Sequence, residues 1–217
     1  MVSFDEQAIL DNGAYIYNQR AEIERIADEI CEKGFDSIFF TSSGGSLAMM
    51  QPFDYMVSVM SDIPVQSQVS ADFLTVGNRR IGKGTLAFMA SKSGDTKETV
   101  AAAKAAKDAG CTIVSTLGVD GSPLGELSDY GVIYKQGRPM ELVLYLLIGK
   151  ILKNRGFFDD YDRFADELVN LPAALDPYAC VVCGECIESC PKHCLTMDTA
   201  RTPVAADKTP TVETKPE

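Results

Sequence analysis

Four cysteines close to the carboxyl-terminal end of the chain have a spacing that suits metal ligation. The segment reads C-x2-C-x2-C-x3-C-P, with Cys180, Cys183, Cys186 and Cys190 as its cysteines. Spacings of two and three residues let one short turn wrap several thiolates around an iron–sulfur cluster. The pattern therefore predicts a [4Fe–4S] cluster bound by these four side chains.

Other ligand sets remain open for this cysteine segment. Five of the seven cysteines lie between positions 180 and 194, a crowding that favours metal ligation over a disulfide scaffold. The fourth position of a cluster could be filled by Cys190 or Cys194, or two chains could pair their halves. Zinc is an alternative, because four thiolates, or three thiolates and the imidazole of His193, suit its tetrahedral geometry. The segment could also be idle and bind no metal.

A second group of polar side chains, in the middle of the chain, carries hydroxyls instead of thiols. The segment Ser91-Lys92-Ser93-Gly94-Asp95-Thr96 stands between an apolar run and an alanine-rich stretch. Free amides at the start of a helix attract anions, the hydroxyls add donors, and Gly94 permits close backbone approach. We interpret this segment as a phosphate-binding loop. The alternative is that Ser93 or Asp95 only caps the helix.

The elements that must position these loops can be outlined from the hydrophobic pattern. A capping box at Ser3 and Glu6 begins a long helix that ends at Gly34. Beyond it, short apolar runs predict strands, and amphipathic runs between them predict helices. The strands are expected at 37–41, 65–69, 85–90, 111–117 and 131–135, and the later helices at 47–60, 97–109, 139–151 and 161–171.

This alternation predicts an α/β fold with a five-stranded parallel sheet and helices on both faces. Right-handed crossovers favour the strand order 2-1-3-4-5 of flavodoxin-like sheets, in which a ligand crevice opens where strands one and three diverge. The hydroxyl-rich loops Ser42–Ser46 and Ser91–Thr96 follow those two strands. We therefore expect the two loops to converge at one end of the sheet.

With these motifs in place, the chain resembles the sugar isomerase (SIS) domain, whose hallmark is a strand, then S-x-S-G-[ED]-T, then a helix. The resemblance covers about residues 1–175 and rests on SKSGDTKET and SSGGS. The segments SADFL, ASKSGDTKETV, SPLGELSDY and ELVLYLL look most like fructosamine deglycases and also resemble the isomerase half of glucosamine-6-phosphate synthase.

The resemblance implies a phosphorylated sugar or a sugar–amine adduct as the ligand, and no cofactor for this domain. It implies contacts to the phosphate from Ser46, Ser91, Lys92, Ser93 and Thr96, beside the glycines Gly45 and Gly94. Related enzymes carry two SIS domains and keep their acid/base carboxylate and histidine in the second. This chain leaves the pattern at NLPAAL, and its single histidine is His193.

Catalytic residues are not assigned by the sequence. Glu98 and Glu141 are the nearest carboxylates along the chain, but solvated helix residues explain both more simply. We predict phosphosugar binding related to fructosamine-6-phosphate deglycase or aldose–ketose isomerase chemistry. The alternative function is a non-catalytic phosphosugar-binding regulatory module, or a half-enzyme whose cysteine segment is idle.

Three parts of the chain are expected. The SIS domain spans residues 1–175, and residues 176–198 resemble half of a bacterial ferredoxin. Residues 199–217 contain three prolines, mixed charges and no aromatic residue, which predicts a disordered tail.

Composition and charge exclude several classes of partner. The formal net charge of −11 argues against nucleic acids, and no apolar stretch approaches the length of a membrane span. The amino terminus lacks the features of a secretory signal, so a cytoplasmic location is expected. The resemblance and a set of helical methionines suggest a homo-oligomer; these are Met49, Met50, Met56 and Met60.

Overall fold

The computed structural model describes residues 6–134 and 140–174. The predicted capping side chain Ser3, the helix start at Pro139, the cysteine segment and the tail lie outside these residues. Within the described ranges, no helix combines the length and the apolar character needed to cross a bilayer.

The core of the fold is a parallel sheet of five strands. In chain order they are β1 (Ser37–Ser42), β2 (Val65–Val69), β3 (Thr85–Ser91), β4 (Thr112–Leu117) and β5 (Tyr130–Ile133). They lie in the order β2-β1-β3-β4-β5, and all four neighbouring pairs are parallel. The central strands β1, β3 and β4 are buried on both faces, as their continuous apolar runs predict. The predicted fold class and strand order are confirmed.

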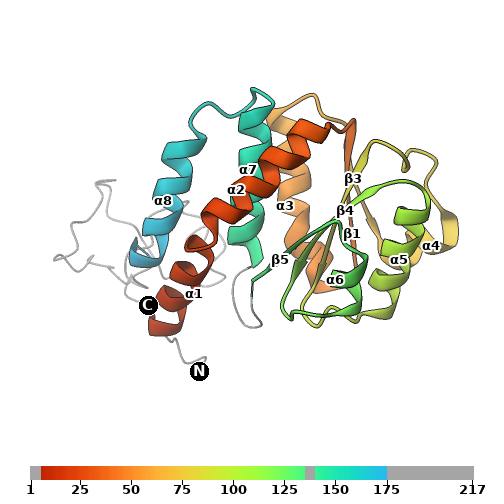
Figure 1. The fold of residues 1–217 in the computed structure, drawn as a ribbon, viewed down its shortest axis with the longest axis horizontal. Helices are drawn as coiled ribbons and strands as arrows, with labels where there is room; N and C mark the ends of the chain where they lie inside the picture. The colour runs from red at the N-terminus through yellow and green to blue at the C-terminus, as the bar shows by residue number, and fades with distance from the viewer. Residues whose placement is uncertain (1–5, 135–139, 175–217) are drawn as a thin grey trace, which may run out of the picture.

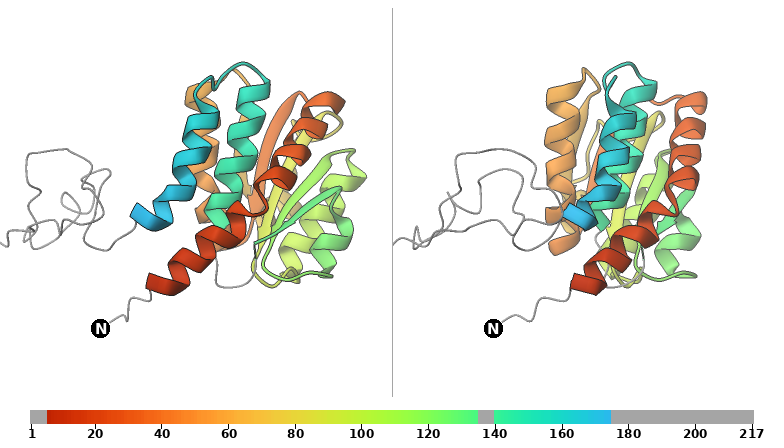
Figure 2. Two further views of the ribbon diagram at one scale, coloured as in Figure 1. Left: turned by 60° about the vertical axis from the view of Figure 1, so that its left-hand side comes forward. Right: turned by 90° about the vertical axis from the view of Figure 1, so that its left-hand side faces the viewer.

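Helices cover both faces of the sheet (Figure 1). One face packs against α2 (Arg20–Lys33), α3 (Gly45–Met60) and α7 (Met140–Asn154). The helices α1 (Glu6–Tyr17) and α8 (Tyr161–Ala174) pack outside α7, and α8 lies in front of it in the right-hand view of Figure 2. The other face carries α4 (Ser70–Val76), α5 (Lys97–Asp108) and α6 (Pro123–Leu127).

Alternate residues of each strand supply these two cores, because successive side chains in a strand point to opposite faces. Phe40 and Val114 belong to the cluster on the α7 face, whereas Phe39 and Ile113 belong to the cluster on the α5 face. A residue's position in its strand therefore fixes the layer into which its side chain is buried.

The predicted helix end at Gly34 is confirmed, but the prediction of one uninterrupted helix is wrong. The chain turns at residues 18–19 and divides that segment into α1 and α2. At the turn, the Gln19 amide donates to the Ile16 carbonyl at 2.9 Å, and the Gln19 side chain donates to the Ile133 carbonyl at 3.2 Å. The bend directs α1 away from the sheet, so that it packs against α8 (Figure 1).

Two short helices were missed by the sequence analysis, α4 and α6. The start of α6 carried a readable signal, because Ser122 caps it by accepting a hydrogen bond from the Gly125 amide, and Pro123 occupies its first turn. In α4, Ser70 is buried and its hydroxyl lies 3.2 Å from that of Thr41 in β1. This contact depends on the tertiary fold and has no local sequence signal.

Candidate functional site: two serine-rich loops at the carboxyl edge of the sheet

The two predicted loops lie side by side, because β1 and β3 are hydrogen-bonded neighbours that run in the same direction. At the carboxyl end of β1, the Ser42 hydroxyl donates to the Ala90 carbonyl of β3 at 2.5 Å. At the next residue of the first loop, the Ser43 hydroxyl accepts a hydrogen bond from the Thr99 hydroxyl of α5 at 3.3 Å. The first loop is thus tied to the helix that follows the second loop.

The second loop folds around the hydroxyl of Ser91. That side chain is buried, and its Oγ accepts a hydrogen bond from the Gly94 amide at 2.9 Å and lies 3.2 Å from Thr96 Oγ1. In this structure, therefore, Ser91 holds the shape of the loop. By contrast, Lys92 and Ser93 are exposed to solvent, where an anion could reach them.

Both loops lead into helices whose first amides are not capped by a side chain. The N-cap of α5 is Thr96 and that of α3 is Gly44, and neither position has a side-chain capping hydrogen bond. The structure therefore contradicts the alternative in which Ser93 or Asp95 only caps α5. Two helix amino termini with free amides meet at one edge, and each favours a negative charge. Of the predicted residues, Gly45 and Ser46 form the first turn of α3.

A third loop, which the sequence analysis missed, supports the second one. It follows β4, and its Gly118 amide donates to the Ser91 carbonyl at 3.2 Å. The Leu124 amide in α6 donates to the Gly94 carbonyl at 2.9 Å. Gly94 is buried against Ser122 so closely that an added Cβ would lie 2.1 Å from Ser122 Oγ. The β4–α6 connection thus packs against the candidate phosphate loop and hydrogen-bonds to its backbone.

The carboxylates considered as catalytic candidates lie in different environments. Glu98 is exposed in the first turn of α5. Glu141 is half-buried in the first turn of α7, and its Oε2 atom has no hydrogen-bond partner among the described residues. The remaining chemical candidates, His193 and the cysteine run, lie outside the described ranges.

Within residues 6–134 and 140–174, no group of three or more histidine, cysteine, aspartate or glutamate side chains is arranged to bind a metal ion. The two cysteines in those ranges are both free. Burial raises the pKa of the Cys111 thiol to about 11 and also raises that of Cys31, so both thiols stay protonated near neutral pH.

Comparison with known proteins identifies a family whose match includes these loops. The SIS domain family matches residues 33–147, a range that contains both serine-rich loops and the whole sheet. The chain belongs to the SIS domain family. The match extends over more than half of the chain and includes the S-x-S-G-D-T segment at 91–96.

Curated relatives of this SIS domain include two kinds of sugar-phosphate enzyme. The glutamine–fructose-6-phosphate aminotransferase of Thermotoga maritima is 31% identical over 156 residues, which cover 66% of this chain and 26% of that protein. The fructosamine deglycase FrlB of Bacillus subtilis is 30% identical over 117 residues, or 54% of this chain and 36% of FrlB. The chain thus spans only about a quarter to a third of these relatives.

Solved structures share the fold at lower identity. The carboxyl-terminal domain of the Francisella tularensis glucosamine–fructose-6-phosphate aminotransferase superposes with a TM-score of 0.60 at 16% identity, covering 77% of this chain and 51% of that one. The Vibrio vulnificus NanR protein, solved in complex with ManNAc-6P, superposes with a TM-score of 0.57 at 18% identity. The superposition covers 78% of this chain and 70% of the NanR chain.

Proposed function

We propose that this SIS domain binds a phosphorylated sugar or a sugar–amine adduct at the carboxyl edge of its sheet. The observation that carries the proposal is the meeting of two uncapped helix amino termini, α3 and α5, joined by the Ser43–Thr99 hydrogen bond. Free amides and exposed hydroxyls suit a phosphate group, and they do so locally even in a chain with a net charge of −11. The names of the curated relatives support a sugar phosphate as the source of that phosphate.

A binding experiment tests this proposal. Calorimetry with fructose 6-phosphate is expected to show saturable binding that Ser93→Ala weakens by roughly tenfold or more, because a hydrogen bond to a charged group contributes about 1.5–3 kcal/mol. Ser58→Ala is the matched control, since among the described residues this exposed serine of α3 donates its hydrogen bond to the Tyr55 carbonyl of its own helix. Equal affinities in all three proteins would contradict the assignment of the loop.

The chemistry we propose for the site is that of a fructosamine-6-phosphate deglycase or an aldose–ketose isomerase. Such a reaction needs a group that moves a proton near neutral pH. Turnover of a sugar phosphate or its amine adduct by the purified chain would support an enzyme. Saturable binding without turnover would favour the alternative, a non-catalytic phosphosugar-binding module or half-enzyme.

We also propose that the chain forms a homo-oligomer through α3. Met50 belongs to the core and Met56 and Met60 pack against it, but α3 still presents an exposed apolar face with Met49, Tyr55 and Val59. The match covers 51% of the Francisella domain, and a second copy of this chain would be comparable in size to the remainder.

Tyr55 is 71% exposed on this face, so Tyr55→Asp is expected to convert a dimer to a monomer. Val76→Asp, at an 81% exposed position on α4 across the sheet, should leave the assembly unchanged. Sedimentation velocity distinguishes the two variants. A wild-type protein that is monomeric at high concentration would overturn the proposal.

The cysteine run is proposed to hold a [4Fe–4S] cluster. Protein purified without oxygen is expected to be iron-rich, with about four iron atoms per cluster, and Cys183→Ala should lose them. Cys31→Ala serves as the control, because Cys31 is a half-buried free thiol within the SIS domain. Zinc in place of iron, or no metal at all, would contradict the prediction.

A further inference from the structure

The outer edge of the sheet, at β2, carries backbone groups without partners. β2 comes first in the strand order β2-β1-β3-β4-β5, so β1 is its one neighbour in the described sheet. The Ile38 amide of β1 donates to the Pro64 carbonyl at 2.9 Å, and alternate residues of a strand direct their amides and carbonyls to the same side. Pro64 and Gln66 therefore face β1, whereas Val65 and Ser67 direct their backbone groups away from the sheet. Among the described residues, no turn or loop bonds to those groups.

This edge lacks the features that usually prevent strand pairing. Natural edge strands are protected by charged residues, prolines or bulges, and Val65–Val69 contains neither a charged residue nor a proline. The strand is half-buried, and its last residue, Val69, is 40% exposed. A groove of about 260 Å³ beside the amino end of β2 is lined by Ser37, Pro64, Val65, Gln66 and Arg80. The edge is thus open to another strand.

The sequence of β2 is a palindrome, Val65-Gln66-Ser67-Gln68-Val69. A two-fold axis through Ser67 would place Val65 opposite the partner's Val69 and Gln66 opposite the partner's Gln68. Such an axis pairs each residue with its counterpart twice, so valine meets valine and glutamine meets glutamine on both sides of the axis. The backbone also fits this register. The Ser67 amide and carbonyl can bond reciprocally to the partner's Ser67, and the Val69 amide can donate to the partner's Val65 carbonyl.

The polar side chains of β2 are already held in place within one chain. The Asn78 side-chain amide donates to Oε1 of Gln66 at 3.3 Å and to Oε1 of Gln68 at 3.1 Å. On the other face, the Ser67 hydroxyl donates to the Asp54 carboxylate of α3. Side chains that are ordered before association lose less conformational entropy when a partner binds. The glutamine amide nitrogens remain as donors toward the partner strand.

We propose that β2 pairs antiparallel with β2 of a second copy of this chain, which joins the two sheets into one of ten strands, five from each copy. Since α3 packs against both β1 and β2, the two copies of α3 lie on the same face of the joined sheet. Neighbouring strands are about 4.8 Å apart, so these helices are about 10 Å apart, roughly the separation of packed helices. The inference rests on the proposed homo-oligomer: the pairing of β2 and the contact through α3 form one dimer interface.

Cysteines at opposed positions test this register. Gln66 and the partner's Gln68 form a non-hydrogen-bonded pair with Cα atoms about 4.5 Å apart, which is within reach of a disulfide. Oxidising a mixture of Gln66→Cys and Gln68→Cys proteins is expected to give a covalent dimer on a non-reducing gel. Each variant alone should match the wild type, because equal positions lie about 7–8 Å apart. The seven native cysteines are common to all samples and are controlled by the wild type.

A proline at the centre of β2 tests the contribution of the backbone. Ser67→Pro removes the outward amide and leaves the groups that bond to β1, so the dimer dissociation constant in sedimentation velocity is expected to rise roughly tenfold or more. Ser67→Ala is the matched control, since it loses the bond to Asp54 but keeps the amide and should remain dimeric. Val69→Lys, at an exposed position outside the β1 ladder, should weaken the dimer as well and serves if the proline variant does not fold.

The outcomes separate this inference from the other proposals. A dimeric wild type whose cysteine variants give no cross-link in the mixture, or whose dimer Ser67→Pro and Val69→Lys both leave intact, would overturn the pairing of β2 and leave the contact through α3. A wild type that is monomeric at high concentration would overturn both. Calorimetry with fructose 6-phosphate tests the sugar-phosphate site separately, because that site lies at the carboxyl edge of β1 and β3.

Discussion

Replacing Gly94 with alanine is expected to destabilise the protein by about 2–5 kcal/mol and to abolish detectable sugar-phosphate binding. Gly94 has a φ of 72°, a left-handed conformation that an alanine adopts only at a cost. Its new Cβ would lie 2.1 Å from Ser122 Oγ and 2.3 Å from Ser122 Cβ, so the loop would have to move. That movement breaks the Gly94–Ser91 hydrogen bond, which shapes the phosphate loop. Denaturant unfolding measures the stability, and calorimetry with fructose 6-phosphate measures the binding.

Gly121→Ala is the matched control for this loop variant. Gly121 lies in the adjoining loop with a similar φ of 63°, but an added Cβ there would have nothing within 4 Å. Gly121→Ala should therefore lower the free energy of unfolding by only about 1–2 kcal/mol, the cost of placing an alanine in a left-handed conformation, and should leave binding intact. Equal losses in the two variants would show that the close packing against Ser122 is not what holds the loop.

Replacing Tyr161 with alanine is expected to cost about 3–5 kcal/mol of stability, because this ring is the link between three helices. Tyr161 is fully buried in α8, and its hydroxyl lies 3.0 Å from the Glu24 carboxylate of α2 and 3.1 Å from the Leu146 carbonyl of α7. An added Cβ on Gly149 would lie 3.0 Å from the ring, so α7 packs directly against it. Burial, together with the Glu24 charge, raises the pKa of the phenol, which stays protonated throughout the physiological range.

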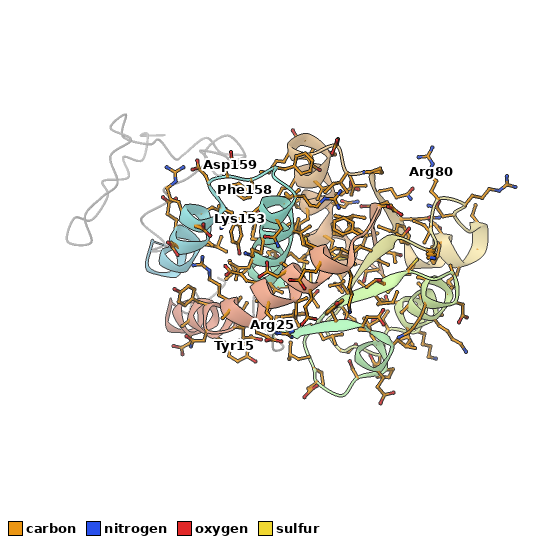
Figure 3. All side chains as sticks on the ribbon, turned by 45° about the horizontal axis from the view of Figure 1, so that its top comes forward. Tyr15, Arg25, Arg80, Lys153, Phe158 and Asp159 are labelled. Atoms are coloured by element: carbon orange, nitrogen blue, oxygen red, sulfur yellow. The ribbon has the colours of Figure 1, made fainter. Side chains whose placement is uncertain are left out.

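Tyr161→Phe separates packing from hydrogen bonding at this site. Phenylalanine keeps the ring and its contact with Phe158, whose centroid lies 6.0 Å away, but leaves the Glu24 and Leu146 oxygens without this donor. We expect a loss of about 1–3 kcal/mol, measured by denaturant unfolding. Figure 3 labels Phe158 and Lys153 in this region, far from Arg80 and the α4 side of the sheet. An alanine variant no less stable than the phenylalanine variant would rule out ring packing as the main contribution.

Most of the sheet could be predicted because its signals are local. Ile38, Phe39 and Phe40 form a continuous apolar run, which suits a strand covered on both faces, and the helices predicted at 47–60 and 97–109 separate β1 from β2 and β3 from β4. The strand order then predicts that the loops after β1 and β3 lie close together, because neighbouring parallel strands end at the same edge of the sheet. The resemblance to SIS domains rests on those loops.

The break between α1 and α2 could not be predicted in the same way. Ile16, Ile23 and Ile26 are all buried and keep helical spacing across the turn, so the pattern reads as one helix. The turn is stabilised by the bond from Gln19 to Ile133, a residue 114 positions away. A local pattern carries no information about such a distant partner.

The sequence by itself determined the parallel sheet, its strand order and the two serine-rich loops, because periodicity and turn chemistry act between near neighbours in the chain. Only the tertiary structure decided that Gly94 packs on Ser122, that Tyr161 joins α2, α7 and α8, and that the Thr116 hydroxyl has no hydrogen-bond partner among the described residues. Each of these depends on which distant side chains share a buried space. Packing and hydrogen-bond satisfaction in that space are properties of the folded chain and not of any segment of it.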